Sequence, residues 1–189
     1  MFDFLFNFDM NFEKISTQML KNTIKYCSIL LLIYYPIMTY FFINSNDPLN
    51  IMESQLSFSA TTLKLEYLTI YTAGSMNTYR IAQIMDFGFM GLYGILLFAV
   101  SLKWSRILKD KKDKKDIWVK TGYSCTLFAL IAAFCDVMEN IFILMMISYS
   151  PDFQFPSSWA IIHSTFALIK WVLLSIIIGW YVIIRIKNR

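Results

Sequence analysis

The chain contains an apolar run, residues 121–147, whose middle carries the polar side chains of Asp136, Glu139 and Asn140. A run of this length can cross a lipid bilayer as a helix, which takes about 20 residues. A charge at the centre of such a helix costs roughly 2.5–3.5 kcal/mol on insertion scales. Residues three and four apart share one helix face, so the three polar side chains point the same way. Small side chains extend this face, which favours contact with other helices over lipid: Cys125, Ala129, Ala132 and Ala133.

Three further apolar runs give the chain the pattern of a membrane protein. Of its 189 residues, 57% are hydrophobic and 16% are charged, a membrane-type composition. We therefore predict an all-α fold, a single integral-membrane domain in which four helices form a bundle. The predicted spans are residues 22–43, 78–102, 121–147 and 159–184, each to within a few residues.

The basic residues predict the orientation of the bundle. They concentrate near the N-terminus, in residues 103–120 and after the last span. Basic segments stay on the cytoplasmic side, so both termini and a basic 103–120 loop are expected there, in the plasma (inner) membrane. The net charge of +4 resides in these segments, and we therefore expect no nucleic-acid partner.

The stretch between the first two spans is too apolar for a free loop. We predict a partly structured extracytoplasmic loop with an amphipathic segment at about residues 54–73, ended by Gly74 and lying over the mouth of the bundle. The spacing of phenylalanines in residues 1–21 predicts an interfacial segment on the bilayer. The first span is interpreted as a packing helix, and Pro36 is expected to kink it.

Polar side chains in spans two, three and four lie at similar depths. Counted at about 1.5 Å per residue, Asp86, Glu139 and His163 lie between the middle and the outer end of their spans. Asp136 and Lys170 lie deeper, both near the midplane. Matching depths on independent spans predict that these groups meet in one site.

The depth match pairs Lys170 with Asp136. Three carboxyl groups face this single lysine, so Asp86 and Glu139 are expected to lack a buried cation. Burial and repulsion between like charges disfavour three ionised carboxylates, and at least one is expected to hold a proton. A proton held beside a lysine suits acid–base chemistry or proton coupling. The alternative is structural: an Asp136–Lys170 ion pair that holds the bundle together.

These arguments define the candidate site. Asp136 and Glu139 are the candidate acid and base, Lys170 the orienting group and Asp86 a further candidate catalytic carboxyl. The candidate ligand-binding side chains are Tyr79, Gln83, Tyr93, Asn140 and His163. A metal could be held by Asp86, Glu139 and His163, but these come from three helices and the chain has a single histidine, so we predict no metal and no cofactor. The three cysteines lie in apolar runs and are expected to be buried free thiols.

The polar elements resemble those of a group of small, functionally uncharacterised four-span membrane proteins. That group has a Tyr seven residues before an Asp in span two, Asp-x-x-Glu-Asn in span three and Lys-Trp in span four. The matching positions, within residues 64–180, are Tyr79 and Asp86, then Asp136, Glu139 and Asn140, then Lys170 and Trp171. The resemblance implies four spans and no particular activity. The architecture is also similar to the sterol-isomerase and sigma-2-receptor superfamily, bundles with intramembrane acids around a lipid-accessible cavity.

Three functions fit this sequence. The first is a pocket for a lipid-like or amphiphilic ligand, with or without acid–base catalysis, in contact with membrane lipid. The second is proton- or cation-coupled transport by a small transporter, as a homo-oligomer because four spans leave little lumen. The third is a membrane binding protein, such as an immunity protein against a membrane-active toxin. Catalysis or transport predicts intolerance to mutation at the buried acids, and toxin binding predicts it in residues 44–78.

Overall fold

The structure is a computed structural model that describes residues 14–49, 51–110 and 116–187. Within these residues every regular element is a helix, and four helices are long and apolar enough to cross a membrane. The prediction of an all-α fold with four long apolar helices is therefore confirmed. The predicted interfacial segment falls largely on residues 1–13, which lie outside the described residues. The helices are α2 (Thr17–Ile43), α3 (Ile51–Gln55), α4 (Ala60–Thr72), α5 (Met76–Lys109), α6 (Asp116–Ile147) and α7 (Ser157–Lys187).

The long helices extend beyond the apolar spans. Much of the predicted 103–120 loop is helical, because α5 continues to Lys109 and α6 begins at Asp116. Hydropathy marks only the part of a helix that suits hydrocarbon, whereas lysine and arginine are good helix formers in water. Arg106 and Lys109 lie in the last turn of α5, where positive charge also complements the helix dipole.

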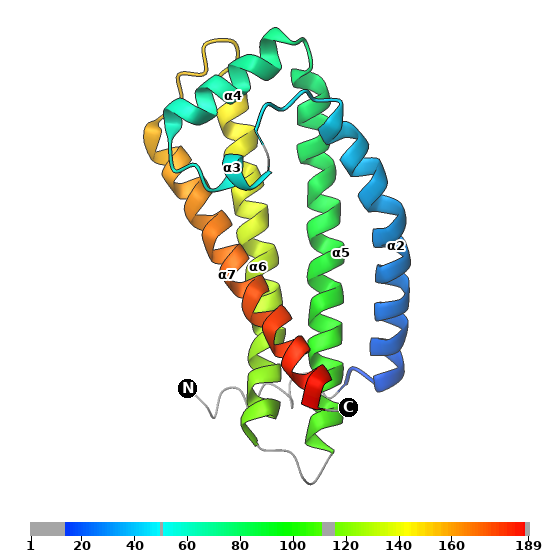
Figure 1. Cartoon of the computed structure of the whole chain (residues 1–189). Helices are drawn as coiled ribbons and strands as arrows, with labels where there is room; N and C mark the ends of the chain where they lie inside the picture. The colour runs from blue at the N-terminus through cyan, green and yellow to red at the C-terminus, as the bar shows by residue number, and fades with distance from the viewer. Residues whose placement is uncertain (1–13, 50, 111–115, 188–189) are drawn as a thin grey trace.

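The long helices pack in sequence order rather than as a closed ring. α2 packs on α5, α5 on α6, and α6 on α7. α4 lies across the top of the bundle in contact with α7 and α5, and the short helix α3 lies below α4 and contacts α7 (Figure 1). At the opposite end α7 meets α5 through a hydrogen bond of 2.7 Å between the hydroxyls of Ser101 and Tyr181. Within the described residues, no interface of comparable size joins α2 to α7.

Two apolar cores hold the bundle, and the polar residues of α6 lie between them. One core lies near the α5–α6 connection and includes Leu102, Ala129 and Ile177. The other lies beneath α4 and includes Tyr67 and Ile143. On α6, the segment 136–140 falls between the contributions to these cores, so the polar site is closed off by apolar packing on both sides along the bundle axis.

α2 attaches to the bundle along α5. The hydroxyl of Tyr34 donates a hydrogen bond of 2.7 Å to the backbone carbonyl of Met85. Gly88 leaves room for this approach, because a Cβ at that position would displace the hydroxyl end of the Tyr34 side chain. α2 contains Pro36 and is bent toward the top of the bundle in Figure 1, as the proline predicts.

The outer cap, defined here as residues 44–75, is built around α4. Ser59 is the N-cap of α4, and its side chain accepts a hydrogen bond from the Thr62 amide. The helix ends before Gly74, which has φ +73°. The amide of Ser75 then bonds to the Ile70 carbonyl, which closes a Schellman-type turn into α5. The buried residues of α4 have helical spacing: Leu63, Glu66, Tyr67 and Ile70.

Candidate functional site

Lys170 is the centre of the buried polar network. Its Nζ lies 2.7 Å from Asp136 Oδ1 and 2.6 Å from Glu139 Oε2, and the lysine is only 4% exposed. The predicted Asp136–Lys170 pair is therefore present. The prediction that Glu139 lacks a buried cation is wrong, because the long lysine side chain reaches from the midplane to the carboxyl one turn farther out. One ammonium group thus bridges two carboxylates of the same α6 face.

Asp86 is the carboxyl without a cation. Among the described residues it forms no ion pair, and it accepts a hydrogen bond of 2.8 Å from Asn140 Nδ2. Asn140 thereby links α6 to α5. A second link is Tyr93, whose hydroxyl donates a 2.7 Å hydrogen bond to Asp136 Oδ2.

His163 lies at the end of the same network that is nearer the cap. Its Nε2 is 3.9 Å from Glu139 Oε1, and both side chains are fully buried. Neither atom has a hydrogen-bond partner among the described residues. The polar groups therefore form a continuous series from Tyr93 through Asp136, Lys170 and Glu139 to His163.

A cavity of about 440 Å³ opens against this network. Of the nine candidate residues, seven line it; Glu139 and His163 do not, since they are buried behind Lys170. The lining candidates are Tyr79, Gln83, Asp86, Tyr93, Asp136, Asn140 and Lys170. Its volume falls within the 300–1,000 Å³ range of small-molecule pockets. Polar groups thus occupy one wall of a space large enough for a ligand.

Most of the remaining lining is apolar or aromatic, and the sequence did not single it out. α2 supplies Tyr35, Met38, Thr39 and Phe42, although it was predicted to be a packing helix. α7 supplies Trp171 and Leu174 on the facing side. The only sequence signal for α2 was its group of tyrosines, and tyrosine is too common in membrane helices to identify a pocket wall.

The cap closes the cavity from above and is tied to α7. Trp171 Nε1 donates a 2.9 Å hydrogen bond to Gln55 Oε1 of α3, and the Phe58 amide donates to the Ser164 hydroxyl at 3.1 Å. Asp47, Ser54 and Gln55 of the cap line the cavity directly. The cap therefore completes the site instead of lying loosely over it.

A second pair of carboxyl groups, missed by sequence reasoning, lies inside the cap. Glu66 is 1% exposed and accepts hydrogen bonds from the Ser54 hydroxyl at 2.8 and 3.0 Å. It also shares a hydrogen bond with Asp47. Burial, together with the charge of Asp47, raises the pKa of Glu66 to about 8, and burial raises the pKa of Asp47 as well. Helical spacing could have found Glu66, which lies on the apolar face with Leu63 and Tyr67.

The pKa of Glu66 predicts that the cap loosens as pH rises. The Glu66 carboxyl binds a proton more tightly in the folded cap than in the unfolded chain. The stabilisation of the cap by this proton is therefore fully present below pH 4.5, the ordinary pKa, and decreases as the pH rises to about 8. The expected slope is about 1.4 kcal/mol per pH unit for one proton. Hydrogen exchange of α4 amides checks this, with Glu66→Gln as the reference at each pH. Equal pH profiles for the two proteins would contradict the prediction.

Comparisons of the chain with protein-family models, curated proteins and solved structures give no match. No group of three or more His, Cys, Asp or Glu side chains in residues 14–49, 51–110 and 116–187 is placed to hold a metal ion. The titratable groups of the site are carboxyls, one ammonium, one imidazole and the phenol of Tyr93.

Proposed function

We propose that this protein binds a lipid-like or amphiphilic molecule in the cavity between α2, α5, α6 and α7. The observation that carries the proposal is the composition of the cavity walls, in which carboxyl and ammonium groups of α5, α6 and α7 face apolar and aromatic side chains of α2. Such a division matches a molecule with one polar end and one apolar end. Because α2 packs on α5 and no interface of comparable size joins it to α7 among the described residues, we expect the apolar wall to lie beside the lipid phase, which favours entry from the membrane.

The lining groups favour a headgroup that donates hydrogen bonds, such as a hydroxyl or an ammonium. Asp86 and Asp136 both line the cavity, and Lys170 is already held between two carboxylates. Asp86 is thus the acceptor most available to a ligand. If the protein is an enzyme, Asp86 and Asp136 can reach the bound molecule, whereas Glu139 acts through Lys170 as a positioning residue.

The test is identification of bound lipid. The protein is purified in mild detergent, extracted with organic solvent, and the released lipid is identified and quantified by mass spectrometry. We expect one class of amphiphile in near-equal amount to the protein, enriched over its share of the membrane. A released mixture with the composition of bulk lipid would count against the proposal.

Proton-coupled transport is the second candidate, and the continuous series from Tyr93 to His163 favours it. Titratable groups in hydrogen-bond or near-contact range can pass a proton between them. Reconstituted vesicles with a pH gradient distinguish the two functions. Proton flux that depends on Glu139 and His163 would favour transport, and its absence together with bound lipid would favour a binding pocket.

We further propose that both termini and the α5–α6 connection face the cytoplasm, because basic residues concentrate at that end. Cysteine introduced at Asn46 or Gln154 should then react with an impermeant thiol reagent added to intact cells, and cysteine at Lys112 should not. The native cysteines are buried, so background labelling is expected to be low. Labelling of Lys112→Cys by the reagent added outside would contradict the proposed orientation and support the opposite one.

A further inference from the structure

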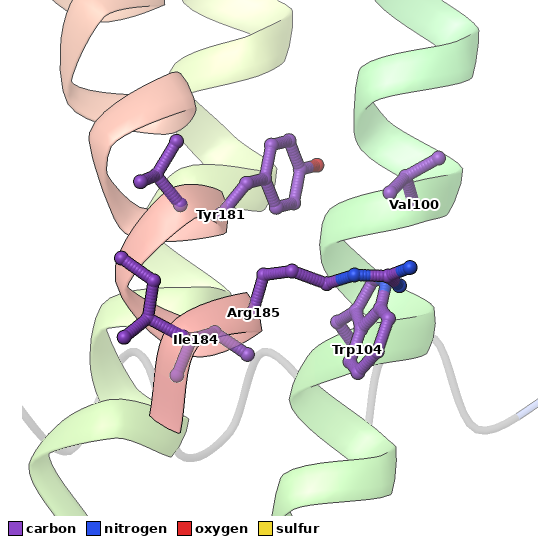
Figure 2. Close-up of a pocket in the computed structure, with 7 residues that line it drawn as sticks. Val100, Trp104, Tyr181, Ile184 and Arg185 are labelled. Atoms are coloured by element: carbon purple, nitrogen blue, oxygen red, sulfur yellow. The ribbon is translucent and has the colours of Figure 1, made fainter. Parts of the chain in front are cut away.

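A second cavity, of about 460 Å³, lies between α5 and α7 at the end of the bundle opposite the cap. Figure 2 shows Tyr181 and Arg185 extending from α7 toward α5, where Val100 and Trp104 form the facing wall. The lining residues, which we call the α5/α7 groove, are Val100, Trp104, Tyr181, Val182, Ile184, Arg185 and Ile186. The groove is separate from the polar network, because the two cavities share no lining residue.

The groove combines one positive charge with apolar walls. Arg185 is the only charged residue that lines it, and among the described residues its guanidinium takes part in no hydrogen bond or ion pair. The hydroxyl of Tyr181 is already used by Ser101 and the Leu97 carbonyl, so its ring serves as wall. A guanidinium that has no partner among residues 14–49, 51–110 and 116–187 favours an anion at the rim, and the apolar walls favour a hydrocarbon chain.

We propose that the α5/α7 groove is a binding site for an anionic phospholipid of the adjacent leaflet. The phosphate or acidic headgroup lies against Arg185, whose planar fork suits phosphate oxygens. An acyl chain lies along Val100, Val182 and Ile186, and the indole of Trp104 lies at the depth of the headgroup, where tryptophan is favoured. The proposal goes beyond the amphiphile pocket, rests on the membrane location, and names a different ligand at the other end of the bundle.

Charge complementarity selects this occupant over a zwitterionic lipid. Lys103 precedes Trp104 in α5, so a second basic residue is close in the sequence to the groove lining. Phosphatidylcholine carries the same phosphate, but its choline brings a second cation close to Arg185 and leaves the headgroup without net negative charge, so it gains less from Arg185 than an anionic lipid does. One arginine near a membrane surface contributes enough to change lipid preference about fivefold.

Fluorescence quenching of Trp104 tests the proposal. The full-length protein is reconstituted into phosphatidylcholine vesicles that contain an equal minor fraction of either dibrominated phosphatidylglycerol or dibrominated phosphatidylcholine. The chain has five tryptophans, and the difference between each protein and its Trp104→Phe counterpart isolates Trp104. We expect dibrominated phosphatidylglycerol to quench Trp104 more strongly than dibrominated phosphatidylcholine does. Arg185→Gln should reduce this preference for phosphatidylglycerol about fivefold.

Lys25→Gln is the matched control, because it removes the same charge from an exposed position of α2 that does not line the groove. The control should keep the parent's preference for phosphatidylglycerol. Equal quenching by the two brominated lipids in the parent would overturn the proposal. So would an unchanged preference in Arg185→Gln, or an equal loss in Lys25→Gln, which would assign the preference to general surface charge.

Discussion

Replacement of Lys170 by methionine should cost about 3–5 kcal/mol of unfolding free energy, the typical penalty for removing one partner of a buried ion pair. The structure gives the reason, because the ammonium lies within 2.7 Å of both Asp136 and Glu139. Without it, two neighbouring carboxylates stay buried with no cation. Unfolding titrations in mixed micelles measure the loss, and Lys25→Met, at an exposed position of α2, serves as the control.

A second variant tests whether the loss of stability comes from the buried charges that Lys170→Met leaves without a partner. The triple change Asp136→Asn, Glu139→Gln and Lys170→Met retains the approximate shapes and removes every formal charge of the ion triad. It should recover most of the lost stability, since no charge remains stranded. A triple variant as unstable as the three single losses combined would mean that the groups act independently and do not form the triad.

Asp86→Asn should leave the fold intact and remove most of the bound amphiphile. The amide that replaces the carboxyl can still accept the hydrogen bond from Asn140, and no ion pair is lost among the described residues. A ligand donor that faces Asp86 loses a charged acceptor, and such bonds contribute about 1.5–3 kcal/mol. Lipid retention should therefore fall about ten- to a hundredfold.

The measurement is the amount of lipid released per protein, beside a thermal unfolding curve. Asp152→Asn removes the same charge from an exposed position in the α6–α7 connection and should release as much lipid as the parent. Normal lipid content in Asp86→Asn, with normal unfolding, would remove Asp86 from the site. A lowered unfolding temperature would instead make Asp86 a structural residue.

A steric variant tests the same cavity without touching charge. Leu174→Trp places a bulky ring into the space that the ligand is proposed to fill, and it should also exclude lipid. Val172→Trp adds the same ring to an exposed position of α7 outside this cavity. Loss of lipid in both tryptophan variants would trace the effect to α7 itself rather than to the cavity.

Sequence was sufficient for the helices and for the polar residues that meet, because both depend on short-range regularities. Helical spacing placed Asp136, Glu139 and Asn140 on one face, and depth along each span brought Lys170 to them. The same count of depth along each span did not predict that Lys170 also pairs with Glu139. Depth was counted at the backbone, whereas a lysine side chain spans more than one helical turn and can serve two carboxyls at once.

Sequence was insufficient for the parts that depend on how helices lie against one another. Tyr35 and Phe42 are residue types that are common on any lipid-facing helix. They become part of a cavity wall only because α2 packs on α5 in the folded bundle. Asp47 and Glu66 are far enough apart in the chain that no local pattern pairs them. Their contact arises from the fold of the cap, in which α3 brings Ser54 beneath α4.

α2 can be displaced from the bundle without breaking the buried ion triad. α2 forms one wall of the cavity, yet none of its side chains belongs to the ion triad, and its anchoring hydrogen bond is the Tyr34–Met85 contact. Displacing α2 therefore forfeits apolar packing and about 1 kcal/mol for that bond, without stranding a buried charge. If the four helices span a bilayer as proposed, displacement of α2 would open the cavity sideways to the lipid while the ion triad stays in place. Exchange of a bound molecule would then leave the groups that recognise it undisturbed.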